Sequence, residues 1–222
     1  MDRGLNYFDA IIYINLDHRT DRNEALLKEL DRLQVAKGKI HRISAHFEPL
    51  NGHKGCALSH SKAAQYAIDQ GFKNALILED DFISLSSRAD IEKIIEHFTS
   101  SLGLNWDVFL IGGTVQHFEK TSLSGINRAL FSQCAHAYAI NNHYFKTLAT
   151  MFLYCYKQME NDLFFIDSPK NAIDYKWNLL MAKDRWYFNE IFAQQGPSYS
   201  DIQLCWRDGA IKNFFKNPIL LE

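Results

Sequence analysis

The sequence predicts a single α/β domain with a mostly parallel central sheet flanked by helices. Short apolar runs alternate with amphipathic stretches of helical spacing over the first half of the chain, an order typical of parallel sheets. The run at residues 75–78 is apolar throughout, as expected of a strand buried on both faces, and it leads directly into Glu79, Asp80 and Asp81. The 222 residues are enough for one such domain.

Composition excludes several functional classes. Hydrophobic residues make up 47% of the chain and charged residues 23%, which is ordinary for a globular protein. The net charge is −2 and no basic run occurs, so we expect no nucleic-acid partner. No signal-peptide pattern and no apolar run of about 18 residues is seen, so we expect a soluble, cytoplasmic protein without a transmembrane segment. The four cysteines form no CxxC pair and are expected to be reduced core residues, neither a disulfide framework nor a zinc site.

The first strand is expected over residues 8–16, followed by a polar turn at residues 17–22. Asp21 and Glu24 have the spacing of a capping box, and the leucines that follow predict an amphipathic helix to about residue 33. A short second strand is expected at residues 40–43. Strand, helix and strand in this order favour a parallel sheet.

Two glycines, Gly52 and Gly55, are expected to precede a second helix that ends at Gly71. The next expected elements are a strand at 72–78, a helix at 88–101, a strand at 106–111 ending in two glycines, a strand at 135–140, and helices at 142–152 and 174–183. Residues 114–130 are polar and turn-rich and are expected to form a mobile loop, and the last 35 or so residues an irregular segment. No repeat or linker is seen, so one domain is expected.

Polar residues gather where the predicted strands end. Ligands of open α/β sheets bind beyond the carboxyl ends of the strands, where residues 15–22, the acidic triplet 79–81 and Gly112-Gly113 are expected to lie. Carboxylates suit a hard divalent cation, and arginines suit phosphate. The alternative is a solvated acidic turn. The chain has neither GxGxxG after its first strand nor GxxxxGK[ST], so a Rossmann dehydrogenase and a P-loop NTPase are not supported. A phosphatase with an Asp nucleophile fits part of the pattern, but no matching downstream set is found.

Three segments, in this order along the chain, resemble glycosyltransferase family 25: they are YINLDHRTDR at 13–22, GCALSH at 55–60 and LILEDD at 76–81. HAY at 136–138 and SDI at 200–202 are also similar to the family, whereas 114–130 and 151–169 match weakly. The family includes lipooligosaccharide and collagen hydroxylysine galactosyltransferases. The resemblance implies a GT-A fold, a nucleotide-sugar donor that is usually a UDP-sugar, and Mn²⁺ (or Mg²⁺) as the cofactor.

The resemblance also implies roles for individual residues. Asp81 is the expected metal ligand, and the expected donor-binding residues are Asn15, Asp17, Arg19, Arg22, Ser59, His60, Glu79 and Asp80. Alternation along an extended chain places Glu79 and Asp81 on one face and Asp80 elsewhere. Further candidates are Gly112, His136 and Asp201. For several of these residues a purely structural role is the alternative to a role in binding. Asn15 and Arg19 would then brace the turn, Ser59 would cap a helix, and His136 would be an interior histidine.

The resemblance also implies transfer with inversion. Such a transfer needs a base that takes the proton of the acceptor hydroxyl, and Asp174 is the candidate, with a helix N-cap as the alternative. Trp177, Trp186 and Tyr187 either stack on a sugar or belong to the core. We expect transfer of a hexose (galactose or glucose) to a hydroxyl of a glycan or glycoprotein, with residues 1–113 as the nucleotide-sugar and metal half and residues 114–222 as the acceptor half. A catalytically silent binding module and a sugar nucleotidyltransferase are the alternatives.

Overall fold

The computed structural model describes residues 3–162, 167–200, 205–207 and 219–220. The strands are β1 Ala10–Asn15, β2 Ile40–Ser44, β3 Asn74–Glu79, β4 Phe82–Ser84, β5 Val108–Leu110, β6 Thr114–Lys120, β7 Asn127–Gln133, β8 Ala137–Asn141, β9 Trp186–Phe188, β10 Ala193–Gln195, β11 Ser198–Ser200, β12 Cys205–Arg207 and β13 Ile219–Leu220. The helices are α1 Thr20–Arg32, α2 Gly52–Asp69, α3 Arg88–Leu102, α4 Phe145–Gln158, α5 Ser168–Asn171, α6 Ile173–Lys176 and α7 Asn178–Met181, with 3₁₀ turns at Gly4–Tyr7, Lys37–Lys39 and Asn142–Tyr144.

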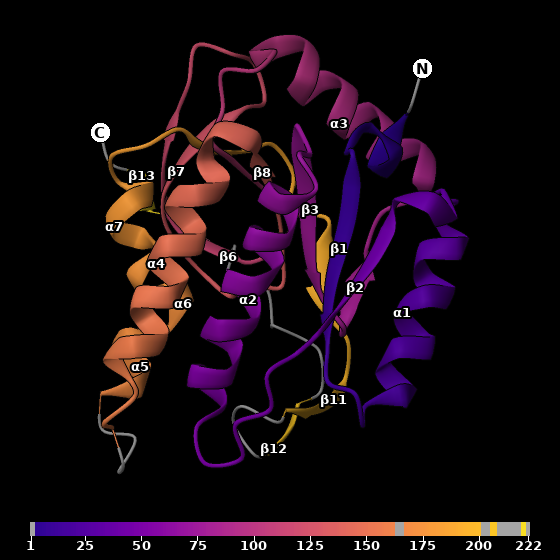
Figure 1. Ribbon diagram of the computed structural model, residues 1–222. Coiled ribbons are helices and arrows are strands. Elements are labelled where there is room, and N and C mark those ends of the chain that lie inside the picture. Colours follow the sequence, from indigo (N-terminus) through magenta and orange to yellow (C-terminus); the bar gives the residue numbers. More distant parts are fainter. Residues whose placement is uncertain (1–2, 163–166, 201–204, 208–218, 221–222) are drawn as a thin grey trace.

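In the described part of the chain, nine strands form one large sheet in the order β13-β6-β7-β9-β5-β8-β3-β1-β2 (Figure 1). β1 pairs in parallel with β2 and β3, β5 with β9, and β6 with β13. β7 and β8 run the opposite way and pair antiparallel with their neighbours. The predicted α/β class, with most strands running in one direction, is confirmed. The carboxyl ends of β1 and β3 therefore meet at one edge of the sheet. The polar residues that follow these two strands lie together at this edge.

Alternate side chains of the central strands enter two separate cores. Ile12 and Ile77 pack on the face covered by α2 and α4, which lie side by side in front of the sheet in Figure 1. Ile11 and Leu76 pack on the opposite face, with α1 and α3. The pleat of a strand causes this alternation, and β1 is buried along its whole length, as its apolar run predicted.

Residues 114–130 belong largely to a β-hairpin, so the prediction of a mobile loop there is wrong. β6 and β7 pair antiparallel, with irregular register near His117. Val115, Ile126 and Ala129 are buried, while most other side chains of the two strands are partly or fully exposed. Because so few side chains of this hairpin point inward, its sequence shows little alternation of apolar and polar residues. The strands that pair with the hairpin, β13 with β6 and β9 with β7, come from distant parts of the sequence. Short strands also lie at 193–195 and 198–200, where an irregular segment was expected.

The start of α1 differs from the prediction. The helix begins at Thr20, and no side chain caps its first turn. Asp21 instead binds the guanidinium of Arg19 at 2.9 Å, so the expected capping box with Glu24 does not form.

The start of α2 differs as well, because the helix begins at Gly52 and contains both glycines that were expected to precede it. The side chain of Asn51 caps it by accepting a backbone hydrogen bond. A Cβ on Gly55 would lie 2.6 Å from the carbonyl oxygen of His46. Helix and preceding loop approach this closely because residue 55 has no side chain. Ser59 lies in mid-helix, where its hydroxyl donates to the Gly55 carbonyl at 2.7 Å and accepts from the His46 N–H at 2.8 Å.

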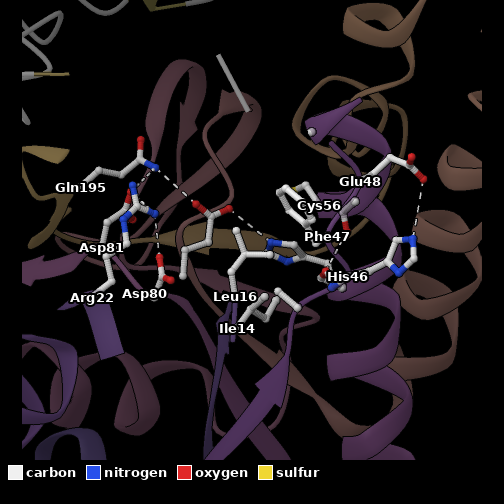
Figure 2. A pocket seen from close by; sticks show the side chains of 16 residues that line it. Ile14, Leu16, Arg22, His46, Phe47, Glu48, Cys56, Asp80, Asp81 and Gln195 are labelled. Atoms are coloured by element: carbon white, nitrogen blue, oxygen red, sulfur yellow. Dashed lines mark hydrogen bonds and ion pairs between the residues drawn. The ribbon is translucent and has the colours of Figure 1, made fainter. Parts of the chain in front are cut away.

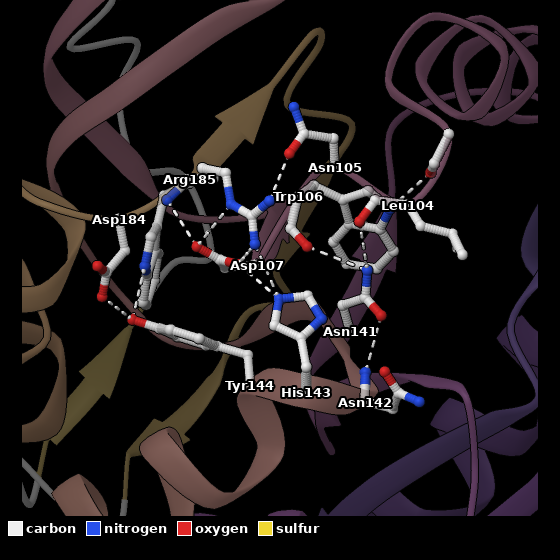
Figure 3. Close-up of polar contacts among 12 residues, drawn as sticks. Leu104, Asn105, Trp106, Asp107, Asn141, Asn142, His143, Tyr144, Asp184 and Arg185 are labelled. Atoms are coloured by element: carbon white, nitrogen blue, oxygen red, sulfur yellow. Dashed lines mark hydrogen bonds and ion pairs between the residues drawn. The ribbon is translucent and has the colours of Figure 1, made fainter.

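A buried acid anchors the other edge of the sheet, at the amino end of β5. Asp107 is 5% exposed and contacts Arg185 at 2.5 Å and His143 at 2.7 Å (Figure 3). The backbone N–H of Arg185 donates to the same carboxylate at 2.8 Å. Burial raises the pKa of Asp107, but the hydrogen bonds from Arg185 and His143 outweigh it and hold that pKa below its usual value. This network ties β9 and the turn before α4 to β5.

Two further predictions concern single features. Cys56 and Cys155 carry free thiols, as predicted, and the side chain of Cys205 lies outside the described residues. None of the helices described for this chain combines the length and the apolar character needed to cross a bilayer.

Candidate functional site

A cleft of about 720 Å³, open to solvent, lies where β1 and β3 end (Figure 2). In Figure 2, Arg22, Asp80, Asp81 and Gln195 lie at one end, and Cys56, His46 and Glu48 at the other. The cleft is lined by Ile14, Leu16, Arg22, Ala45, His46, Phe47, Glu48, Gly52, Gly55, Cys56, Ser59, His60, Glu79, Asp80, Asp81 and Gln195.

The acidic triplet divides between two sets of neighbours. Asp80 faces the side of α1, where its carboxylate accepts hydrogen bonds from Asn15 at 2.7 Å and from Arg22 at 2.8 Å. Glu79 faces the side of α2, where one carboxylate oxygen lies 3.3 Å from Nε2 of His60. The alternation of β3 continues into the turn and causes this division.

Gln195 joins Glu79 and Asp81 from the same side. Its amide nitrogen donates to Oε2 of Glu79 at 3.3 Å and to Oδ2 of Asp81 at 3.2 Å. These two carboxylates therefore share a side of the cleft, as the alternation predicted, and Asp80 does not. Gln195 is brought there by β10, which pairs antiparallel with β4 directly after the triplet.

Burial raises the pKa of both carboxylates, and their different neighbours give them different proton affinities. For Glu79, burial raises the pKa, but the hydrogen bond and charge of His60 outweigh it, so the pKa is lowered. For Asp81, burial and then the charge of Glu79 raise the pKa to about 7. Oδ1 of Asp81 is buried and has no hydrogen-bond partner among the residues that the structure describes. A buried carboxylate oxygen with an open coordination position fits a hard divalent cation, which takes oxygen ligands.

The other residues predicted to bind a donor lie at different distances from the cleft. Arg22, Ser59 and His60 line it, whereas Asn15, Asp17 and Arg19 are not part of its wall. Asn15 is 1% exposed; besides Asp80, its amide contacts the Arg19 carbonyl at 3.0 Å and accepts from Arg42 at 2.9 Å. These contacts fit the bracing role, and donor contact by these three residues remains a prediction.

Asp17 is exposed and contacts Nη2 of Arg42 at 2.6 Å and the hydroxyl of Ser44 at 2.8 Å. These two hydrogen bonds lower the pKa of Asp17. Arg42, which belongs to β2, thus connects this strand to the polar turn that follows β1. The sequence analysis did not identify it, because its neighbours are set by the β1–β2 register.

His60 has both ring nitrogens engaged. Nδ1 lies 2.8 Å from the hydroxyl of Tyr138, and the two rings stack with centroids 5.8 Å apart. Tyr138 lies on β8, within the HAY segment, and is fully buried. The imidazole is thereby oriented with Nε2 toward Glu79.

Asp174 lies in the first turn of α6, and the helix predicted at 174–183 is split into α6 and α7. It is not the N-cap: Ala172 holds that position, and the Asp174 carboxylate accepts a hydrogen bond from the backbone N–H of Cys134 at 2.9 Å. Its charge, together with that of Glu79, adds to the effect of burial in raising the pKa of Cys56. Asp174 does not line the cleft, and its catalytic role remains a prediction.

The remaining candidates that the structure describes do not line the cleft. His136 is 1% exposed and packs against Gly112, where a Cβ would lie 2.4 Å from Nε2 of the imidazole. Trp177 and Trp186 are fully buried and pack on each other, so they belong to the core and not to a sugar platform. Asp201 lies outside the described residues.

Several residues of the cleft wall were not predicted from the sequence, among them Gln195, Phe47 and Cys56. Gln195 carries no local signal, since only its pairing with the β4 strand places it beside the triplet. Phe47, 54% exposed, meets the ring of His18 edge to face at the rim. Cys56 was assigned to the core, although its spacing of four residues from His60 places both on one face of a helix.

Comparison with known proteins is informative at the level of family and fold. The family described as "Glycosyltransferase family 25 (LPS biosynthesis protein)" matches residues 6–160. Procollagen galactosyltransferase 1 of Danio rerio is 27% identical over 142 residues, which cover 53% of this chain and only 23% of that relative. A glycosyltransferase involved in the glycosylation of the major capsid of PBCV-1 has a TM-score of 0.51, with 11% identity over 82% of this chain and 80% of that one. The predicted GT-A type of fold is confirmed.

Proposed function

We propose that this chain, which belongs to glycosyltransferase family 25, transfers a hexose from a UDP-sugar to a hydroxyl of a glycan or glycoprotein, with inversion at the anomeric carbon. The observation that carries the proposal is the cleft at the carboxyl ends of β1 and β3, with three carboxylates and Arg22 at one end. Galactose or glucose is the proposed sugar, in keeping with the galactosyltransferase name of the matched relative.

A divalent cation, Mn²⁺ or Mg²⁺, is proposed at Asp81. Oδ1 of Asp81 has no hydrogen-bond partner in the described part of the chain, and this supports the placement, because a bound cation would provide the missing interaction and favour the ionised carboxylate. When bound, such a cation supplies positive charge to the diphosphate of the donor. Arg22, which belongs to α1, lies 2.8 Å from the carboxylate of Asp80 and 3.9 Å from that of Asp81, and its positive charge holds both carboxylates in place.

Glu79 and His60 are proposed to bind the donor's ribose or sugar hydroxyls. The Glu79 carboxylate is ionised because its pKa is lowered, so it accepts hydrogen bonds from hydroxyl groups. Tyr138 fixes the ring of His60 from behind, which preserves the direction of Nε2.

Asp174 is proposed as the general base. The acceptor oxygen forms a bond to the anomeric carbon, the bond from that carbon to the diphosphate breaks, and UDP leaves with the electron pair. The proton of the acceptor hydroxyl passes to the carboxylate of Asp174. The supporting observation is that α6, which carries Asp174, packs against α2, and several residues of α2 line the cleft.

The test uses UDP-galactose and UDP-glucose with Mn²⁺. We expect a thermal shift with one of them and release of UDP on addition of acceptor, since a ligand that binds only the folded state raises its stability. Release of pyrophosphate would indicate a nucleotidyltransferase, and donor binding without any turnover a silent homologue.

Two variants separate the proposed roles. Asp81→Ala should lose the Mn²⁺-dependent part of donor binding and stay folded; unchanged UDP-sugar affinity with Mn²⁺ would rule out Asp81 as the ligand. Asp174→Asn should keep donor binding and lose transfer, because the amide can still accept the Cys134 N–H but cannot take a proton. Near-normal turnover of this variant would exclude Asp174 as the base.

A further inference from the structure

Three side chains of complementary ligand chemistry meet on the wall of the cleft nearest α2. Cys56 and His60 lie one turn apart on that helix, and Glu79 lies at the end of β3. Each offers one ligand atom (a thiol sulfur, an imidazole nitrogen and a carboxylate oxygen), and the three atoms lie within 4.8 Å of one another. All three residues line the cleft, so this cluster is open to solutes.

We infer that Cys56, His60 and Glu79 form a binding site for a thiophilic divalent cation of the Zn²⁺ type, distinct from the hard-cation site proposed at Asp81. Sulfur and nitrogen ligands suit zinc, whereas Mn²⁺ and Mg²⁺ take oxygen. Glu79 lies between the two sites. Its Oε1 faces His60, and its Oε2 faces the amide of Gln195, which also contacts Asp81.

The spacing of the ligand atoms fits a tetrahedral ion. Nε2 of His60 and Oε1 of Glu79 are 3.3 Å apart. Two ligands on tetrahedral zinc, with bonds of about 2.0–2.1 Å, are separated by about 3.3–3.4 Å. The sulfur requires a separation of about 3.6 Å from each, and the three ligand atoms already lie within 4.8 Å of one another.

The imidazole is already oriented as a metal ligand. A ligating histidine uses one ring nitrogen for the metal and binds a neighbouring group with the other. Nδ1 of His60 lies 2.8 Å from the Tyr138 hydroxyl, so Nε2, which faces Oε1 of Glu79, is the nitrogen that would bind an ion placed between these two atoms. With three protein ligands, the fourth position opens to the cleft, as in zinc sites that exchange a ligand.

Occupancy of this site has a consequence for the donor. A Zn²⁺ ion bound to Oε1 would occupy the carboxylate that is proposed to accept hydrogen bonds from the donor's hydroxyl groups. We therefore expect Zn²⁺ to weaken donor binding. This consequence rests on the proposed function; the binding of zinc does not.

The experiment uses the full chain without an affinity tag, stripped with EDTA and titrated with Zn²⁺ by calorimetry, and with Co²⁺ by absorption spectroscopy. We expect one equivalent of Zn²⁺ and a thiolate-to-cobalt charge-transfer band. Cys56→Ser should weaken Zn²⁺ binding at least tenfold and abolish the band. Cys155→Ala is the matched control, because Cys155 is buried in α4 and does not line the cleft. Circular dichroism checks that each variant is folded.

Asp81→Ala separates the two cation sites, since it should lose Mn²⁺-dependent donor binding but change the Zn²⁺ affinity far less than Cys56→Ser does. Equal Zn²⁺ affinity of wild type and Cys56→Ser, or a Co²⁺ spectrum without a thiolate band, would overturn the inference. Neither measurement uses a donor, so a wrong assignment of the enzymatic reaction leaves the zinc result interpretable.

Discussion

Replacing Asp81 by Asn tests the electrostatics of the cleft without any substrate. The side chain is 10% exposed, and burial together with the charge of Glu79 raises its pKa from 3.8 to about 7. Asn keeps the shape and can still accept from Gln195, which lies 3.2 Å away, but it carries no titrating proton. The variant therefore removes one ionisation and little else.

The sign and size of the effect follow from linkage. A folded-state pKa above the unfolded value means that the folded protein holds the proton more tightly than the unfolded chain. The free energy of unfolding of the wild type therefore falls, relative to that of Asp81→Asn, as pH rises from about 4 to about 7, and it is level above that range. Each pKa unit corresponds to about 1.4 kcal/mol, so the full difference is up to about 4 kcal/mol.

The assay is urea unfolding in EDTA at pH 5, 6, 7 and 8, followed by the fluorescence of the buried tryptophans. Asp81→Asn should gain stability relative to the wild type toward pH 8. Asp31→Asn, an exposed position on α1, is the matched control and should follow the wild type at every pH. Mn²⁺ should stabilise the wild type increasingly from pH 6 to 8, because its binding displaces the Asp81 proton, and should not stabilise Asp81→Asn. Parallel pH curves for wild type and Asp81→Asn in EDTA would refute the reasoning, because they would mean that the carboxyl ionises as freely as in water.

Two further predictions concern the scaffold of the cleft. Gly55→Ala should lower the free energy of unfolding by about 1–3 kcal/mol, because its Cβ would meet the His46 carbonyl oxygen at 2.6 Å, whereas Gly38→Ala meets no atom within 4 Å; equal urea midpoints would contradict this. Asp107→Asn should destabilise by about 2 kcal/mol at pH 7, measured by urea unfolding, with the difference lost as pH falls through the lowered pKa of Asp107. Glu119→Gln, which removes a surface ion pair, should change stability little, and an equally small effect of Asp107→Asn would show that the buried network is not stabilising.

The central strands and the main helices could be predicted because their signals are local. An apolar run such as residues 75–78 can be buried only in the interior of a sheet, and the positions of its side chains follow from the pleat. For the same reason, the opposite directions of Glu79 and Asp80 could be deduced from their order alone. The hairpin of β6 and β7 could not, because few of its side chains face the core and its neighbours β9 and β13 are distant in sequence.

Within the candidate site, the sequence by itself determined which chemical groups follow β1 and β3, and therefore that carboxylates and arginines meet at one edge of the sheet. Only the tertiary structure decided which of those groups touch. It placed Gln195 between Glu79 and Asp81, Arg42 on Asn15, and Cys56 near Glu79. The physical reason is that backbone alternation sets the direction of a side chain locally. Its partner, its burial and hence its pKa depend on segments that strand pairing and helix packing bring from far along the chain.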